Sequence, residues 1–432
     1  MPRIRIQERR ARGRGPADRC ALSRQPVLGP RAARSHRSRP GGGRFRLEAA
    51  VSGQAARRPA ADRGRSAAPL PRERAHAPRG GIRLHGWPAP LGRARGGDGP
   101  AAREATRHRG RVRHSRRLTR ALVIGGAGFI GTAACKELMR RGVETIAAGR
   151  TERPYGTFTS YVAFDRTDEA QLKRALETTE PDVVLDLACW EPSEVEAVIR
   201  NFKGERYVFV SAGIVYPDLD GRPAREDDFV PLDGDPPAEI DYQQGKRWCE
   251  TLLMGSALQW TVVRPPAVFG PADRTLRIAA YIQRVADGGP LLVPEETYER
   301  QLGLAWNKDI GYACALACDV RKDARGKAYN AGFEGVSLRD LVEGIARALG
   351  VEARVHQVPF KELSEDSCPY ASAPERPGGY VIDRARTELG FEPSALEDAL
   401  AETLAWYRVA RPSHPGYANR AAELELSGAG AG

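Results

Sequence analysis

The chain has 432 residues, of which 67 are basic and 55 acidic, giving a formal net charge of +12. Residues 1–117 contain 31 Arg, no Lys and seven acidic residues, a charge of +24, whereas residues 118–432 carry −12. The part with the composition of a folded protein is acidic, so the overall positive charge does not indicate a nucleic-acid partner. No apolar run approaches the ~18 residues of a membrane span, so we expect no membrane partner.

Residues 1–117 are dominated by Arg, Ala, Gly and Pro and show no apolar period that would build a core. We expect this extension to be disordered. Three explanations for it remain open. We favour a start codon assigned too early in GC-rich DNA, with Leu118 as the true initiator. An Arg-rich organelle transit peptide and a basic arm for RNA or DNA are the alternatives.

From residue 120 onward, short apolar runs alternate with amphipathic segments, a pattern typical of βα units and a parallel sheet. We therefore predict an α/β fold, with a doubly wound Rossmann sheet over 118–271 and nucleotide at the carboxyl ends of the strands. The predicted strands are 120–126, 143–150, 161–167, 182–188, 205–213 and 260–265. The predicted helices are 131–142, 168–181, 192–204 and 241–257.

After Pro271 the pattern loosens, and helices are predicted at 277–289, 337–350 and 395–409. We assign 272–412 to a smaller α+β substrate-binding region with return segments to the Rossmann domain, and 413–432 to a flexible tail. Seven cysteines without C-x-x-C spacing favour a reducing cytoplasm over a disulfide framework. Only two histidines lie outside the extension, so we expect no metal site.

The stretch "ALVIGGAGFIG" begins at Ala121 and carries the first chemical signal. Gly125 or Gly126, with Gly128 and Gly131, forms a glycine-rich turn that also contains Phe129 and Ile130. Glycine permits the tight turn, the approach of a pyrophosphate and close packing of the next helix, whose N-terminus favours phosphate. Because the turn follows a strand and precedes a helix, it predicts dinucleotide binding.

Two residues at the ends of the next strands bear on the cofactor. An acidic residue after the second strand would bind a ribose 2′-hydroxyl, whereas Arg accommodates a 2′-phosphate. Arg150 occupies this region, so NADP is favoured over NAD. Asp165, after the third strand, either binds the adenine amino group or caps the following helix.

The catalytic candidates are Tyr242 and Lys246, in "YQQGK". Residues four apart lie on one face of a helix, so the ammonium can stand near the phenol. A nearby cation favours the phenolate, and Tyr242 would then exchange the proton of a substrate hydroxyl while a nicotinamide exchanges hydride.

Together these features resemble the extended short-chain dehydrogenase/reductase superfamily, specifically the NAD-dependent epimerase/dehydratase family of nucleotide-sugar enzymes. The resemblance spans about residues 119–408. It rests on "GGAGFIG", "FDRTD", "DLA" at 186–188, "VSAGIVY" at 210–216, the Tyr242–Lys246 pair, "RPPAVFGP" at 264–271, "YNAG" at 329–332 and "LGFEP" at 389–393.

The resemblance implies roles for individual residues. Gly125, Gly128, Gly131 and Ala188 would line the cofactor, Tyr242 would be the acid/base, and Lys246 would orient the nicotinamide ribose. Arg264 and Pro266 would border the nicotinamide and substrate pocket, and Arg300 would bind a diphosphate. Relatives often form homodimers through two long helices, here 241–257 and the helix around 193–203.

Two departures from the family pattern stand out. The family usually places two hydroxyl residues before x-x-Val-Tyr, and the second is catalytic; here the pair is Ser211-Ala212. Either Ser211 serves after a one-residue shift, which we favour, or this hydroxyl is missing. The second departure is Gly149-Arg150, where family epimerases tend to carry an acid. Together with "SAGI", it also resembles a branch related to chloroplast stem-loop RNA-binding proteins, which tends to lack the catalytic Tyr.

We therefore predict an NAD(P)-dependent enzyme that acts on a nucleotide sugar or a related hydroxyl or keto substrate. Epimerase and reductase activities rank ahead of dehydratase, because Gly213 and Ile214 stand where dehydratases of this family carry acids. The alternative is a non-catalytic NADP- or RNA-binding protein of the same fold.

Overall fold

The structure is a computed structural model that describes residues 119–153, 155–364 and 366–428. The extension at 1–117 and the proposed start at Leu118 therefore lie outside the described residues. None of the described helices combines the length and apolar character needed to cross a bilayer.

A parallel sheet of seven strands organises the described chain, in the order β10-β6-β5-β4-β1-β2-β3. Its central strands are almost wholly buried and mostly apolar, as expected when helices cover both faces. The predicted α/β fold is confirmed, and the strand order reverses between β1 and β4, where a ligand crevice forms in such sheets. The strands are β1 (Arg120–Ile124), β2 (Glu144–Gly149), β3 (Ser160–Ala163), β4 (Val183–Asp186), β5 (Arg206–Val210), β6 (Trp260–Arg264) and β10 (Lys327–Asn330).

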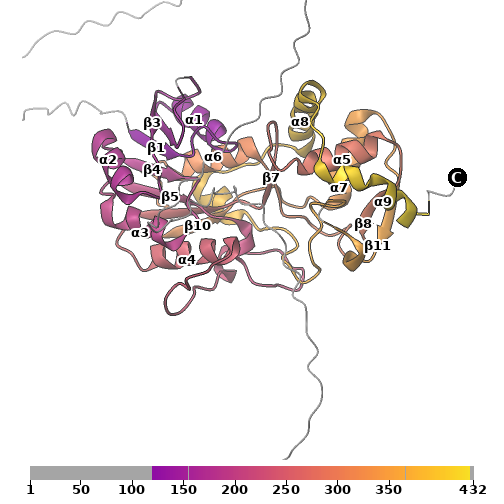
Figure 1. Cartoon of the computed structure of the whole chain (residues 1–432). Helices are drawn as coiled ribbons and strands as arrows, with labels where there is room; N and C mark the ends of the chain where they lie inside the picture. Colours follow the sequence, from indigo (N-terminus) through magenta and orange to yellow (C-terminus); the bar gives the residue numbers. More distant parts are fainter. Residues whose placement is uncertain (1–118, 154, 365, 429–432) are drawn as a thin grey trace, which may run out of the picture. The chain divides into compact units, whose positions relative to one another are not determined.

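Helices cover the two faces of the sheet (Figure 1). On one face, α1 and α6 pack against alternate strand residues such as Val123, and on the other α2, α3 and α4 pack against the intervening ones, such as Leu122. Gly311 of α6 lies so close to α1 that an added Cβ would be 2.7 Å from the Ala133 Cβ. The helices are α1 (Gly131–Arg140), α2 (Glu169–Thr179), α3 (Pro192–Asn201), α4 (Tyr242–Met254) and α6 (Asn307–Ala317).

A second apolar cluster, distinct from the sheet's two cores, lies mainly among elements after Pro271 and also includes Phe269. Figure 1 shows these elements gathered away from α2 and α3, as the predicted smaller α+β region. Both α6 and β10 return to the Rossmann sheet. The remaining elements are β7 (Ala267–Phe269), α5 (Arg277–Ala286), β8 (Leu291–Pro294), β9 (Leu304–Trp306), α7 (Leu338–Leu349), β11 (Val355–Val358), α8 (Leu396–Ala410) and α9 (Arg420–Leu426).

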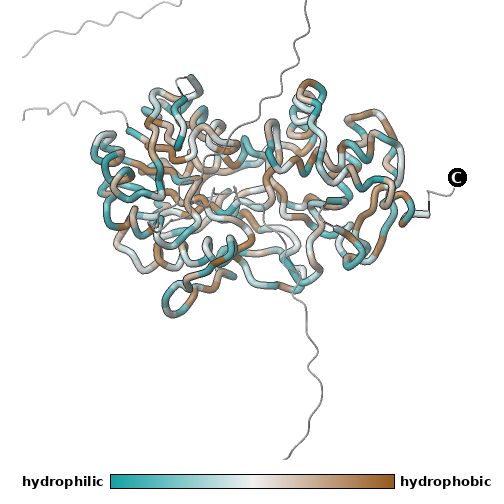
Figure 2. Tube along the Cα trace, in the orientation of Figure 1, coloured by the Kyte–Doolittle hydropathy of each residue, from teal (hydrophilic) through white to brown (hydrophobic). Residues whose placement is uncertain are grey.

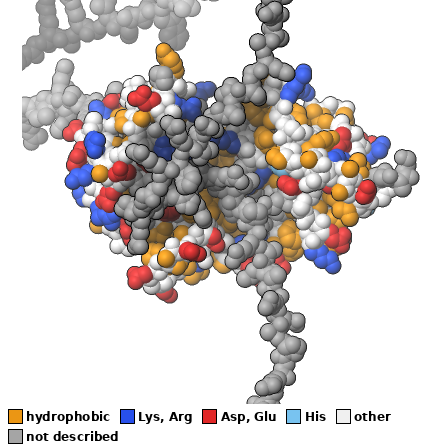
Figure 3. All heavy atoms as spheres, in the orientation of Figure 1, with side chains coloured by type: hydrophobic (Ala, Val, Ile, Leu, Met, Phe, Trp, Pro, Cys, Tyr) orange, Lys and Arg blue, Asp and Glu red, His pale blue; other side chains and the backbone are white. Residues whose placement is uncertain are grey.

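Hydropathy and charge follow this layering. Figure 2 shows hydrophobic residues along the strands and hydrophilic stretches in peripheral turns. On the face shown in Figure 3, acidic and basic side chains are interspersed around α2 and α3. This face of the described chain therefore carries no continuous basic patch there.

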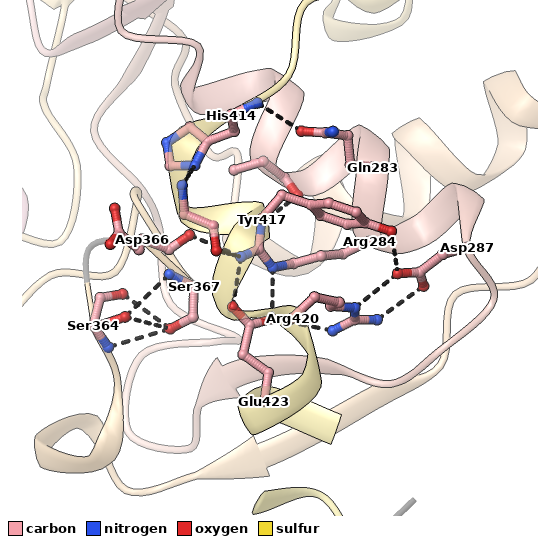
Figure 4. A network of polar contacts seen from close by, with 12 residues as sticks. Gln283, Arg284, Asp287, Ser364, Asp366, Ser367, His414, Tyr417, Arg420 and Glu423 are labelled. Carbon is pink, nitrogen blue, oxygen red and sulfur yellow. Dashed lines mark hydrogen bonds and ion pairs between the residues drawn. The ribbon is translucent and has the colours of Figure 1, made fainter. Parts of the chain in front are cut away.

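The carboxyl-terminal segment differs from the flexible tail predicted over 413–432. Its described part forms a short 3₁₀ helix (Pro415–Asn419) and α9, which are tied to α5 (Figure 4). The buried Arg284 guanidinium of α5 donates to Glu423 at 2.8 and 2.5 Å, and Arg420 pairs with Asp287 at 2.7 Å. The sequence-based expectation was wrong because the polarity of this segment is used in tertiary ion pairs.

Candidate functional site

The glycine turn joins β1 to α1 as predicted. Gly125 has a φ of +83°, a left-handed conformation that favours glycine. Gly131 is needed for a different reason, because a Cβ at this position would lie 2.1 Å from the Gly125 carbonyl oxygen. Close packing of the first helical residue on the turn therefore requires glycine.

The start of α1 is suited to an anionic ligand. Its N-cap is Ile130, and no side chain caps the first-turn amides. Gly128 is exposed, and Ala188 borders the turn, because a Cβ on Gly125 would lie 3.8 Å from the Ala188 Cβ. The structure therefore brings the predicted cofactor residues at this edge together, with Phe129 between Gly128 and Ile130, and leaves amide donors for a pyrophosphate.

The ends of β2 and β3 lie on one side of this turn. Arg150 is exposed directly after β2. Asp165 accepts hydrogen bonds from the amide and hydroxyl of Thr167 at 3.1 and 2.8 Å. The alternative in which Asp165 caps α2 is wrong, because Asp168 is the cap residue. A cavity of about 540 Å³ adjoins β3 and includes Arg153 in its lining.

Tyr242 and Lys246 begin α4, whose N-terminus is capped by Asp241. The Lys246 side chain is buried, and its ammonium donates to the carbonyl oxygens of Cys189 at 2.6 Å and Val210 at 2.7 Å. Its Nζ lies 5.6 Å from the centroid of the Tyr242 ring. The helical spacing therefore places cation and phenol together, at the carboxyl ends of β4 and β5.

The loop after β4 closes on the same turn of α4. The Trp190 ring lies 6.3 Å from that of Tyr242, and a Cβ on Gly245 would be 2.3 Å from the Trp190 carbonyl oxygen. The glycine within "YQQGK" therefore lets the loop approach Tyr242 and Lys246.

Ser211 occupies a different environment from the one its predicted role requires. It is 3% exposed, and its hydroxyl oxygen is buried without a hydrogen-bond partner. Its amide donates to the Val263 carbonyl at 2.8 Å, which holds the residue against β6. Ala212, at the family's catalytic position, is less buried and carries no hydroxyl.

Arg264 was predicted to border the substrate pocket, but it is completely buried. Its guanidinium contacts Glu250, with a closest approach of 2.5 Å, and donates to the Tyr216 hydroxyl at 2.9 Å and to the Glu226 carbonyl at 3.0 Å. These partners enclose it within the protein, so direct contact with substrate is contradicted. The sequence predicted that the Arg264 guanidinium contacts the substrate, whereas tertiary packing pairs it with the Glu250 carboxylate.

Pro266 and Arg300 retain some surface. Arg300 donates from one terminal nitrogen to the Pro374 carbonyl at 2.8 Å, while its Nε is buried without a partner. Burial lowers the pKa of Arg300. A guanidinium with unsatisfied hydrogen-bonding capacity remains compatible with the predicted anion contact.

Sequence reasoning missed a buried polar cluster at the end of β4. Arg166 contacts Asp186 at 2.6 Å and Glu194 at 3.0 Å, and the Tyr207 hydroxyl donates to Asp186 at 3.0 Å. Burial opposes the charge on Arg166, but the acidic neighbours outweigh it and raise the pKa. Asp186 also accepts a hydrogen bond from the Ala188 amide at 3.0 Å, so the cluster shapes the loop that carries Ala188. The sequence stretches "FDRTD" and "DLA" contain Arg166 and Asp186. Their spacing in the sequence does not show that the two side chains pair.

The fold and this arrangement define a Rossmann-type α/β protein with a Tyr-x-x-x-Lys pair at the carboxyl ends of the sheet strands. Residues 121–197 match the sequence model of the NAD dependent epimerase/dehydratase family. The predicted resemblance to this family is thereby confirmed over these residues.

Several curated proteins are similar to this chain. The chloroplast stem-loop binding protein of 41 kDa b of Arabidopsis thaliana is 28% identical, over 53% of this chain and 63% of that protein. The match therefore spans less than two thirds of that relative. A UDP-N-acetyl-alpha-D-glucosaminuronate decarboxylase of Bacillus cytotoxicus is 25% identical, over 67% of this chain and 98% of the relative.

Among solved structures, the UDP-glucose 4-epimerase of Thermus thermophilus in complex with NAD has a TM-score of 0.52 and 22% identity. The match covers 68% of this chain and all of that one. Epimerase Mth375 of Methanothermobacter thermautotrophicus gives a TM-score of 0.53 at 21% identity, covering 68% and 93% of the two chains. At these identities the likeness supports the fold.

Proposed function

We propose that the protein is an NAD(P)-dependent epimerase or reductase acting on a nucleotide sugar or a related hydroxyl or keto substrate. The observation that carries the proposal is the position of Tyr242 and Lys246 at the same sheet edge as an uncapped, glycine-lined helix terminus. One end of this edge suits a diphosphate, and the other offers a proton-transfer group.

The cofactor would be held by the turn at 125–131 and by Ala188. A bound nicotinamide would supply hydride acceptance and return at C4. Arg150, exposed after β2, supports NADP over NAD, while Asp165 would approach the adenosine through its remaining oxygen. The solved relatives in complex with NAD support a nicotinamide cofactor in general.

Tyr242 would be the acid/base residue. Its phenolate would accept a proton from a substrate hydroxyl, or its phenol would return one to a carbonyl oxygen. The Lys246 ammonium lies beside this ring, with its Nζ 5.6 Å from the centroid. Two of its three N–H groups are used by the Cys189 and Val210 carbonyls, so one donor remains to hold the ribose.

The substrate class rests on relatives named for nucleotide sugars, including a dTDP-4-dehydro-6-deoxy-D-allose reductase of Streptomyces that is 25% identical over 67% of this chain. We assign Arg300 to the diphosphate, because its side chain keeps some exposed surface and donates one hydrogen bond, to the Pro374 carbonyl. Pro266 would border the nicotinamide pocket. Arg264 would act only through packing.

The test combines cofactor binding and turnover. NADPH and NADH are titrated by fluorescence, and UDP-glucose, UDP-glucuronic acid and dTDP-glucose are offered as substrates. Tyr242→Phe should reduce kcat by a factor of 10² to 10⁴, on the order expected for general acid–base catalysis, with cofactor Kd unchanged. Full activity in Tyr242→Phe, or no dinucleotide binding by the wild type, would refute the proposal.

A second candidate function is RNA binding, which the chloroplast stem-loop binding relative favours. The interspersed charges on the face in Figure 3 argue against it for that face. RNA retention by the full chain, without turnover and unaffected by saturating NADPH, would favour this alternative.

We further propose a homodimer through α3 and α4, which pack together on one face of the sheet, and a cytoplasmic location. The six cysteines of the described chain are unpaired and buried, consistent with a reducing compartment. Sedimentation analysis would test the dimer.

A further inference from the structure

The active site proposed above lacks one expected hydrogen-bond donor. Tyr242 can exchange a proton, but a second hydroxyl normally holds the reacting oxygen, and Ala212 cannot supply it. The neighbouring Ser211 hydroxyl is enclosed beneath the site surface. A donor from another part of the chain is therefore required.

Tyr380, which lies 168 positions after Ala212 in the printed sequence, reaches this position. A Cβ placed on Gly213 would be 2.3 Å from the Tyr380 phenolic oxygen. The hydroxyl therefore touches the backbone immediately after Ala212. Within the described chain, no residue forms a hydrogen bond with this hydroxyl.

Two glycines make room for the Tyr380 ring. Besides the contact at Gly213, a Cβ on Gly303 would be 2.4 Å from the ring's Cε2 atom. Both glycines have negative φ angles, so their backbone conformation does not require glycine. The absence of side chains at these positions is explained by the ring. The same Gly303 Cβ would lie 3.3 Å from Pro266, which places the ring beside the predicted nicotinamide pocket.

The backbone around Tyr380 is fixed by strand-like pairing. The Ala224 amide donates to the Gly379 carbonyl at 3.0 Å, and the Val381 amide donates to the Ala224 carbonyl at 2.9 Å. Upstream, Arg376 donates to Gln243 at 3.3 Å, and Gln243 directly follows Tyr242. The segment that carries Tyr380 is thus fastened next to the first turn of α4.

We propose that Tyr380 donates a hydrogen bond to the reacting oxygen of the substrate, replacing the hydroxyl that is absent at Ala212. The inference rests on the proposed function and deepens it. Tyr380 is a second catalytic residue, supplied by the carboxyl-terminal half of the chain, so residues from both halves complete the site.

The two phenols have different environments. Burial raises the pKa of Tyr380 to about 12, so its hydroxyl remains protonated and acts as a donor. Tyr242 has the Lys246 ammonium 5.6 Å from its ring centroid, whereas for Tyr380 the effect of burial on the pKa outweighs that of the Arg376 charge. No bond to Tyr380 forms or breaks: the transferred proton belongs to Tyr242, and Tyr380 stabilises charge developing on the substrate oxygen.

The decisive variant is Tyr380→Phe, assayed with UDP-glucose, UDP-glucuronic acid and dTDP-glucose. We expect kcat to fall about 10²-fold, as when one oxyanion donor is removed, while the Kd for NADPH and the unfolding temperature stay at the wild-type values. Tyr370→Phe is the control, because it removes a tyrosine hydroxyl that has no hydrogen-bond partner and that lies in the separate carboxyl-terminal core. Adding Ala212→Ser to Tyr380→Phe should restore kcat about tenfold.

A crystal structure with bound NADPH provides a test that does not depend on the substrate. Two hydroxyls that bond one oxygen must lie within about 6 Å of each other, so the Tyr242 and Tyr380 phenolic oxygens should meet this limit. A larger separation overturns the inference, as does wild-type kcat in Tyr380→Phe while Tyr242→Phe is inactive. Loss of kcat in Ser211→Ala with an active Tyr380→Phe would return the role to Ser211. Activity retained in Tyr242→Phe would instead refute the proposed function.

Discussion

Two polar regions of the molecule use their hydrogen-bonding groups in opposite ways. The nucleotide edge comprises the turn at 125–131 and the Tyr242–Lys246 pair. The carboxyl-terminal anchor comprises residues 283–287 of α5 and residues 414–423. At the nucleotide edge, α1 has no side-chain cap and Arg150 is exposed. In the anchor, Arg284 alone donates to a carboxylate and to three carbonyl groups (Figure 4).

This difference distinguishes polar groups that can bind a ligand from polar groups that stabilise the fold. Buried polar groups that satisfy one another stabilise a fold and offer nothing to a ligand. Groups that are positioned by the fold but lack partners keep their capacity for a ligand. Arg264 and Arg300 illustrate the same contrast, because the Arg264 guanidinium is buried and paired with Glu250, whereas the Arg300 side chain keeps some exposed surface.

The largest expected effect is on the anchor. Glu423→Ala would leave the buried Arg284 without its carboxylate and should cost about 3–5 kcal/mol in the free energy of unfolding, the range for broken buried pairs. NADPH affinity of the folded protein should be unchanged. Chemical denaturation measures the free energy of unfolding, and fluorescence titration measures the NADPH affinity. Glu425→Ala, at an exposed position of α9, is the control and should be neutral.

At the nucleotide edge, Gly131→Ala tests the close approach of helix and turn. A methyl group 2.1 Å from the Gly125 carbonyl must displace the turn, at a cost of about 1–3 kcal/mol, and should weaken NADPH binding. Gly255→Ala is the control, since a Cβ there has no neighbour closer than 3.8 Å. Unaltered cofactor affinity in Gly131→Ala would mean that the turn does not hold the pyrophosphate.

A smaller effect is expected for cofactor preference. Arg150→Ala should weaken NADPH binding about tenfold, equivalent to ~1.4 kcal/mol, and leave NADH binding unchanged. Parallel fluorescence titrations with the two cofactors measure the ratio, with exposed Arg174→Ala on α2 as the control. Equal losses for both cofactors would contradict a 2′-phosphate contact.

The smallest effect concerns pH and the anchor. Burial, assisted by Arg284, lowers the pKa of His414, whose Nδ1 accepts from the Gly416 amide at 3.1 Å. Below its unfolded pKa of about 6.5, the unfolded chain takes up a proton more readily, so this contribution to stability declines as pH falls. His414→Asn keeps an acceptor but does not titrate. Its Tm should fall less than that of the wild type between about pH 7.5 and pH 5.5, and an identical decline would exclude His414.

Local features made the nucleotide edge predictable. The strands up to Arg264 are short apolar runs in the sequence. The residue spacing in "GGAGFIG" and in "YQQGK" reflects the backbone geometry of a single turn and a single helix. The structure confirms that Tyr242 and Lys246 are neighbours. The anchor was mistaken for a flexible tail because the partners of α9 lie more than 100 residues away.

Sequence by itself therefore determined the repeated βα pattern, the glycine turn and the Tyr-Lys pair, because each depends on contacts within a few residues. Only the tertiary structure decided that Arg264 is enclosed by Glu250, that α9 is fastened to Arg284, and that Tyr380 reaches the backbone beside Ala212. The physical reason is that burial and ion pairing depend on contacts between segments that are distant in the sequence. Local residue spacing does not predict those contacts.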